Sequence, residues 1–355
     1  MLGAYLPTRP SRRRRRWLAE AWRNACFESD PEEPMPRHFI LAVGPDAAVP
    51  WAWAAHFMSR DSGRCILTLV HVVKAGLCGS SSLGRLGESM VDADAPWLLP
   101  EMRALMRENP LVRAVEVWAW GGTTVAKALL AWLGDLPRPA PTLLVMGQSR
   151  PWYAWSISRF VAKHAHICPV VVVRDAGCGS GQKASGVRSG VCAVPPPAAN
   201  EARNVVIAVD GRWPGSGELV QWSRDFLLSV RDHVSLLNIL PHTFSHNDKH
   251  HAEMERCQLI LRNWMVFKGG GSATTVELPS QKSSPGRAIC AFLKAGCGRG
   301  PAHLLIMGSR TGHILPWRST SGYVLKHARC PVLSVDDTKL QMLLENALYM
   351  PAVEF

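Results

Sequence analysis

A run of small residues after a buried strand has the clearest chemical pattern in this chain. Leu304 to Met307 is a short apolar run, and Gly308, Ser309 and Arg310 follow it directly. Glycines at the end of a strand let backbone N–H groups approach a phosphate, and the next helix adds the positive end of its dipole. Ser319 precedes the segment that is typical of this helix. The pattern indicates a candidate phosphate-binding loop.

The elements that must position this loop are visible on both sides of it. Gly322 to His327 is typical of a short helix, with cations near its end that suit the helix dipole. Pro331 then opens a second apolar run, Val332 to Val335. The apolar runs before and after the helix indicate buried parallel strands. The unit is therefore strand, glycine loop, helix and strand.

The same unit occurs earlier in the chain, between Thr142 and Arg174. Gly147 stands 161 positions before Gly308, and Pro169 stands 162 positions before Pro331. A shared order of features at a nearly constant offset indicates an internal duplication. We therefore expect two domains built on one plan.

These motifs resemble the universal stress protein family. The resemblance rests on the Gly-Ser-Arg loop at Gly308, the Ser-Thr pair at Ser319, the run from Tyr323 to Val332, and Asp210 after an upstream strand. It covers most of the chain and is more specific in the C-terminal half than in the N-terminal half.

The resemblance implies an α/β fold with two tandem five-stranded parallel-sheet domains, Rossmann-like and similar to the adenine-nucleotide alpha-hydrolases. Apolar strands alternate with helices along the chain, which agrees with parallel sheets covered on both faces. The expected organisation is a disordered basic tail at 1–36, a first domain at 37–175, a linker at 176–202, a second domain at 203–337, and a C-terminal helix and tail at 338–355.

The resemblance also implies a nucleotide site in the second domain. ATP-binding members of the family carry an acidic residue after the first strand and a loop of the form Gly-x2-Gly-x9-Gly-Ser/Thr. Asp210 matches the acidic residue, and the matches within the loop are Gly308, Ser309, Arg310 and Ser319. The resemblance assigns no catalytic residue and no metal ligand.

Departures from that pattern weaken the expectation of ATP binding. Arg318 stands where the last loop glycine is expected, and the path from Gly308 to Ser319 is shorter than the family's loop. In the first domain Gly44-Pro45 replaces the acidic residue, and aromatic residues fill the loop. We expect the first domain to be degenerate, and ATP to bind weakly or not at all, and only in the second domain.

Three functions remain open at this stage. The first is a non-enzymatic binding or signalling module related to the stress response. The second is an ATP-binding protein with slow hydrolysis in the second domain. The third is a nucleic-acid-associated protein that uses the cluster from Arg12 to Arg16, which contributes to a net charge of +12. Under the first two functions, we expect no nucleic-acid partner.

The two halves of the chain are expected to bind each other. Val170–Val173 is apolar at every position, and Val332–Val335 at every position except Ser334, so each strand needs cover on both faces and would be sticky as a sheet edge. We expect them to lie together as an intramolecular pseudo-dimer, with a further homo-oligomer left open. No apolar run approaches the ~18 residues of a membrane span. The cytoplasm is the expected location, with an organelle or the nucleus as alternatives.

Two smaller features complete the expectations. Lys339 to Leu348 carries leucines at helical spacing and should pack on the second domain or its neighbour. His246, His250, His251 and Asp248 have the residue types of a metal site, but a solvated loop is the preferred interpretation.

Overall fold

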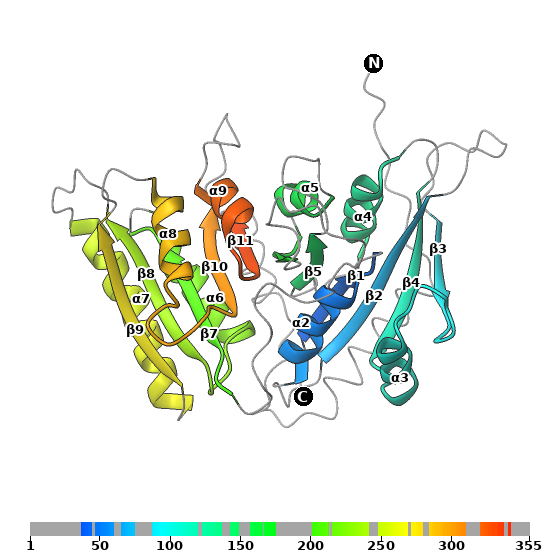
Figure 1. The fold of residues 1–355 in the computed structure, drawn as a ribbon, viewed down its shortest axis with the longest axis horizontal. Helices are drawn as coiled ribbons and strands as arrows, with labels where there is room; N and C mark the ends of the chain where they lie inside the picture. Colours follow the sequence, from blue (N-terminus) through cyan, green and yellow to red (C-terminus); the bar gives the residue numbers. More distant parts are fainter. Residues whose placement is uncertain are drawn as a thin grey trace, which may run out of the picture.

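The protein is described from a computed structural model that covers residues 37–44, 47–59, 65–74, 87–119, 123–136, 143–148, 157–165, 167–174, 201–211, 213, 215–240, 248–268, 271–279, 284–309, 320–336 and 340–341. Within these ranges the chain forms one mostly parallel sheet with helices on both faces (Figure 1). The expected tail, residues 176–200 of the expected linker, and the loop residues Arg310 to Ser319 lie outside the described residues.

The first half of the chain contributes six strands and four helices to the described structure. Continuous apolar runs form the buried strands among them. Their bounds are β1 (Arg37–Ala42), α2 (Ala48–Ser59), β2 (Cys65–Lys74), β3 (Gly87–Val91), α3 (Pro100–Glu108), β4 (Val112–Ala119), α4 (Val125–Gly134), β5 (Leu143–Gln148), α5 (Ile157–His164) and β6 (Val170–Arg174).

The second half repeats the alternation with five strands and four helices in the described residues. Their bounds are β7 (Asn204–Val209), α6 (Ser216–Phe226), β8 (His233–Leu240), α7 (Asp248–Lys268), β9 (Ser272–Pro279), α8 (Pro285–Lys294), β10 (Leu304–Ser309), α9 (Thr320–His327) and β11 (Val332–Asp336).

All of these strands belong to a single 11-stranded sheet in the order β3-β4-β2-β1-β5-β6-β11-β10-β7-β8-β9. This corrects the expectation of two five-stranded sheets. Neighbours pair in parallel except at β3–β4 and β6–β11, where the pairing is antiparallel. The additional strand is β3, which pairs with β4 at the edge of the sheet and directly follows a Gly/Ser-rich stretch of sequence.

The junction of the halves is the antiparallel pair β6–β11. Val332 pairs with Val172, and Leu333 pairs with Val171. The prediction that these two valine-rich strands lie together is confirmed. Each strand thereby gains a hydrogen-bonded neighbour on the side that would otherwise be an open sheet edge.

Side chains reinforce the junction on both sides of the sheet. The indole N–H of Trp53 donates to the carbonyl of His303 at 3.3 Å, and an Arg37 Nη donates to the carbonyl of Asp225 at 3.4 Å. Arg174 donates to the carbonyl of Ala328 at 3.1 Å, just beyond the last turn of α9. A cation at this position suits the negative end of the helix dipole.

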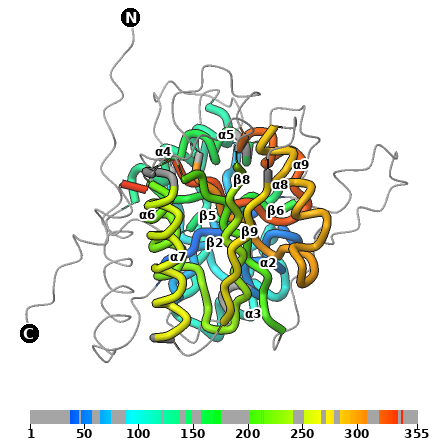
Figure 2. The backbone as a smooth tube through the Cα atoms, turned by 90° about the vertical axis from the view of Figure 1, so that its left-hand side faces the viewer, coloured from blue at the N-terminus to red at the C-terminus, as the bar shows by residue number. Residues whose placement is uncertain are grey.

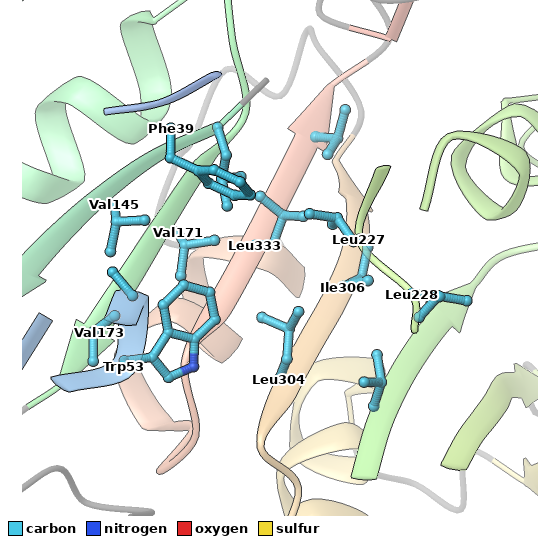
Figure 3. Close-up of a cluster of buried hydrophobic side chains, with 14 of the residues drawn as sticks. Phe39, Trp53, Val145, Val171, Val173, Leu227, Leu228, Leu304, Ile306 and Leu333 are labelled. Atoms are coloured by element: carbon cyan, nitrogen blue, oxygen red, sulfur yellow. The ribbon is translucent and has the colours of Figure 1, made fainter. Parts of the chain in front are cut away.

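Helices cover the sheet on both faces. Figure 2 shows α6 and α7 on one side of β8 and β9, and α8 and α9 on the other. On the first side, a single buried cluster contains residues from both halves, including Trp53, Val171, Leu304 and Leu333 (Figure 3). The opposite face carries two separate clusters, one for each half. The shared cluster makes the two halves one packed body on that face.

The predicted packing of the C-terminal segment can be compared with the structure at residues 340–341. Leu340 is 3% exposed and belongs to the shared cluster, as expected if the segment from Lys339 packs on the fold. Residues 342–355 lie outside the described residues. No helix among the described residues is long and apolar enough to cross a membrane.

Candidate functional site

The two predicted site residues that the structure describes in full, Asp210 and Gly308, come to the same edge of the sheet. Ala208 of β7 pairs with Met307 of β10 in parallel, so Gly308 and Asp210 follow closely at the carboxyl ends of neighbouring strands. Ser309 is the last residue of β10 and pairs with Asp336. Arg310 and Ser319 lie outside the described residues.

The position is where a ligand would be expected in such a sheet. From β7 the chain runs outward to β8 and β9, and then returns to β10 on the other side of β7. Ligands of open α/β sheets bind at this reversal of strand order, outside the carboxyl ends of the strands. Asp210 and Gly308 flank that reversal.

Asp210 is held by its backbone, with its side chain exposed. Its carbonyl accepts hydrogen bonds from the backbone N–H of Trp213 at 2.7 Å and from Oγ of Ser216 at 2.8 Å. The N–H of Ser216 donates to the carbonyl of Trp213 at 3.0 Å. Two successive turns therefore fold the chain back at the end of β7 and lead into α6.

Trp213 fills the space beside Gly308, a contact that the sequence analysis did not predict. A Cβ added to Gly308 would lie 1.9 Å from Cζ3 of Trp213, far inside van der Waals contact. The indole also lies against Gly215, where a Cβ would be 2.6 Å from Cζ2. Trp213 is 6% exposed. Two glycines thus leave room for one indole, which gives Gly308 a packing role independent of any phosphate.

A carboxylate from α7 satisfies the start of helix α6. Glu253 accepts the N–H of Gly217 at 2.6 Å, and Glu218 accepts a hydrogen bond from Arg256 at 2.8 Å. A carboxylate at this end of a helix is favoured by the helix dipole. The hydrogen bond to Glu218 raises the pKa of Arg256. The protein itself thus supplies the anion at this helix start.

The buried thiol next to this network is poorly suited to nucleophilic chemistry. Burial, followed by the negative charge of Glu253, raises the pKa of Cys257 to about 12. Since the thiolate is the reactive form, Cys257 is unreactive near neutral pH. Among the described residues, no group of three or more His, Cys, Asp or Glu side chains could hold a metal ion.

The first half carries a pair of polar residues on neighbouring strands, at the position where the second half also has a polar pair. His71 of β2 pairs with Glu116 of β4, just as Asn238 of β8 pairs with Glu277 of β9. The two pairs occupy equivalent positions in the two halves. Asn238 pairs with Val209, the last residue of β7, and His71 directly follows Val70, which pairs with Ala42, the last residue of β1.

The first-half pair is held by neighbouring groups. Nδ1 of His71 lies 2.9 Å from the carbonyl oxygen of Val43, and since a carbonyl can only accept, Nδ1 carries the proton. The indole N–H of Trp97 donates to Glu116 at 2.7 Å, and the Trp97 ring stacks on His71 with centroids 5.0 Å apart. These contacts agree with the interpretation of His71 as a structural residue.

Comparison with known proteins defines the fold. No model of a protein family matches the sequence, and no curated protein matches it. The chain is similar to a solved universal stress protein from Archaeoglobus fulgidus DSM 4304, with a TM-score of 0.51 and 14% identity, over 84% of this chain and 96% of that one. A functionally unknown protein from Pseudomonas aeruginosa PAO1 matches with a TM-score of 0.45 and 12% identity, over 88% and 97%.

A shorter structure matches only part of the chain. The universal stress protein UspA from Lactobacillus plantarum gives a TM-score of 0.25 and 16% identity, over 38% of this chain and 98% of that one. The Archaeoglobus likeness extends over most of the chain. The protein therefore has the universal stress protein fold, and the resemblance seen in the sequence is confirmed at the level of the fold.

Proposed function

We propose that this chain is a tandem universal-stress-protein-like binding or signalling module, non-enzymatic and related to the stress response. The observation that carries the proposal is the likeness of the fold to a universal stress protein over 84% of the chain. The thiols of Cys257, Cys290 and Cys297 are free, which suits a reducing compartment, and the cytoplasm is the proposed location.

The proposed working unit is an intramolecular pseudo-dimer. Its support is the antiparallel pairing of β6 with β11, together with the hydrogen bonds of Trp53, Arg37 and Arg174 across the junction. In this arrangement one chain supplies the contact that two identical subunits would make. A disulfide engineered with Val172→Cys and Val332→Cys tests it: a cross-link within one chain supports the proposal, and a cross-link formed only between chains contradicts it.

We further propose that ATP binding is weak or lost, and confined to the second half around Asp210, Gly308, Ser309, Arg310 and Ser319. Each charge-assisted bond from a loop amide to phosphate contributes roughly 1.5–3 kcal/mol, so a shortened loop loses affinity quickly. Trp213 adds a steric reason, because its indole takes the space beside Gly308 that a closely bound nucleotide would need.

A titration of labelled ATP into the wild type and Asp210→Ala tests the ATP part of the proposal. We expect no micromolar binding to either protein. Micromolar binding that Asp210→Ala abolishes would contradict the loss of ATP binding and favour the hydrolysing alternative. Micromolar binding that Asp210→Ala leaves unchanged would contradict the site assignment. Mass spectrometry of molecules released from the native protein would then identify any other ligand.

A further inference from the structure

The indole of Trp213 occupies a position with the properties of a binding site. It lies against both Gly215 and Gly308, each close enough that a Cβ would overlap the ring. A flat group packed against glycine backbones gains close contacts that a side chain at either position would prevent. The position is therefore shaped for a planar aromatic group.

The location of this indole distinguishes it from an ordinary core tryptophan. Trp264 is also buried and also lies against a glycine, since a Cβ on Gly271 would be 2.7 Å from its Cη2. Gly271, however, precedes β9 and lies at the amino end of that strand. Trp213 lies at the carboxyl ends of β7 and β10, where the strand order reverses and ligands of such sheets bind.

The chain segment that carries Trp213 forms two turns. Its backbone bonds to Asp210 and Ser216, and the residue precedes helix α6 without belonging to it. The backbone pairing of β7 with β10 is made without the indole, whereas removing the indole takes packing from the shared cluster.

We propose that Trp213 is an internal occupant of an aromatic-binding position at the end of β7 and β10, and that it excludes adenine-type ligands from this position. The inference deepens the proposed loss of ATP binding, on which it rests, by naming the residue responsible. When the indole is removed, the position accepts a planar aromatic molecule such as a nucleoside.

The test compares four proteins, namely the wild type, Trp213→Ala, Trp213→Leu and the matched control Trp264→Ala. Each is titrated with adenosine and with indole, with binding measured by calorimetry and by the shift in melting temperature. We expect adenosine to bind Trp213→Ala at least tenfold more tightly than the wild type, and to leave Trp264→Ala unaffected. Trp213→Leu retains more packing and serves if the alanine variant does not fold.

Indole separates a binding site from a simple cavity. If indole stabilises Trp213→Ala and Trp264→Ala alike while adenosine stabilises neither, the removed side chain left only an apolar cavity, and the inference is overturned. It is also overturned if the folded Trp213→Ala and Trp213→Leu proteins bind neither compound. Adenosine binding by Trp213→Ala alone supports it.

The same measurements keep the inference distinct from the proposed function. The wild-type titration with ATP decides whether ATP binding is lost. The difference between the wild type and Trp213→Ala decides whether Trp213 causes the exclusion. If the wild type does not bind ATP and Trp213→Ala does not gain adenosine binding, the proposed function is retained and the role of Trp213 is rejected.

Discussion

Val171 and Leu333 lie opposite each other where β6 meets β11, and neither is exposed to solvent. Both side chains belong to the buried cluster that takes residues from the two halves. The junction is therefore packed as well as hydrogen-bonded. Because one core serves both halves on this face, separating the halves would expose the apolar surface of each, which is costly in water.

The first prediction concerns the cooperativity that this shared core should produce. We expect Val171→Asp to lower the free energy of unfolding by about 3 kcal/mol or more, because it buries a carboxylate among apolar groups. Thr275→Asp, at an exposed position of β9, is the control and should cost less than about 1 kcal/mol. Urea unfolding followed by circular dichroism and by tryptophan fluorescence measures both.

The wild type should unfold in one transition with the same midpoint by both probes. Two separate transitions, with only one of them sensitive to Val171→Asp, would contradict the view that the halves form one body.

The second prediction concerns the contact between Gly308 and Trp213. Gly308→Ala should destabilise the protein by about 1–3 kcal/mol, because the new methyl group overlaps the indole. Gly44→Ala is the matched control, since a Cβ at Gly44 meets nothing within 4 Å. Thermal or urea unfolding of the single variants and of Gly308→Ala with Trp213→Leu completes a double-mutant cycle.

We expect a coupling free energy of about 0.5–3 kcal/mol between these two positions, with the Gly308 substitution better tolerated once the indole is gone. If the effects of the two substitutions are additive, the contact with Trp213 is not the reason that position 308 is a glycine.

The third prediction concerns a buried ion pair beneath β7. Arg203 donates from Nε to Asp232 at 2.7 Å, and both side chains are almost fully buried. Asp232→Ala should cost about 3–5 kcal/mol, because it leaves a buried guanidinium without its charged partner. Asp94→Ala breaks the Arg107–Asp94 pair, whose side chains are 61% and 82% exposed, and should cost less than about 1 kcal/mol.

Chemical denaturation of the two alanine variants distinguishes them. Equal costs for Asp232→Ala and Asp94→Ala would show that burial does not control the contribution of these pairs.

The repeat in the sequence was enough to predict most strands and their pairing at the junction. Strands such as Val170–Arg174 are continuous apolar runs, and a run that is apolar on both faces must be covered on both. Strand β3, with the sequence GESMV, was missed because it is short and partly polar. A short edge strand can form through backbone hydrogen bonds to its neighbour, so its side chains give little indication in the sequence that a strand is present.

The site was harder to predict for a related reason. Gly308 was expected to serve a phosphate, since glycine permits close approach of any group. The group that approaches in the structure is Trp213, which lies 95 positions earlier in the chain. The nearby Gly215 was a local signal, but only the fold brings the two glycines to one indole. A glycine shows that something lies close, and the sequence alone does not identify it.

The last prediction concerns the buried thiols of the second half. Burial raises the pKa of Cys257 to about 12, and that of Cys290 and Cys297 to about 11, from an ordinary value of 9.0. At pH 8 the three thiols should react slowly with iodoacetamide in the native protein and rapidly in urea, because only the thiolate is nucleophilic. Mass spectrometry of the alkylated peptides measures this difference.

The same shifts determine the sign of the dependence of stability on pH. Well below pH 9 these thiols are protonated almost completely in both states, so they add almost no slope. Between pH 9 and about 11 to 12 the unfolded chain releases its thiol protons while the folded protein keeps them, and stability falls as the pH rises. Cys257→Ala should reduce that alkaline loss relative to the wild type. An unchanged alkaline slope, together with rapid alkylation of native Cys257 at pH 8, would show that this thiol is open to solvent.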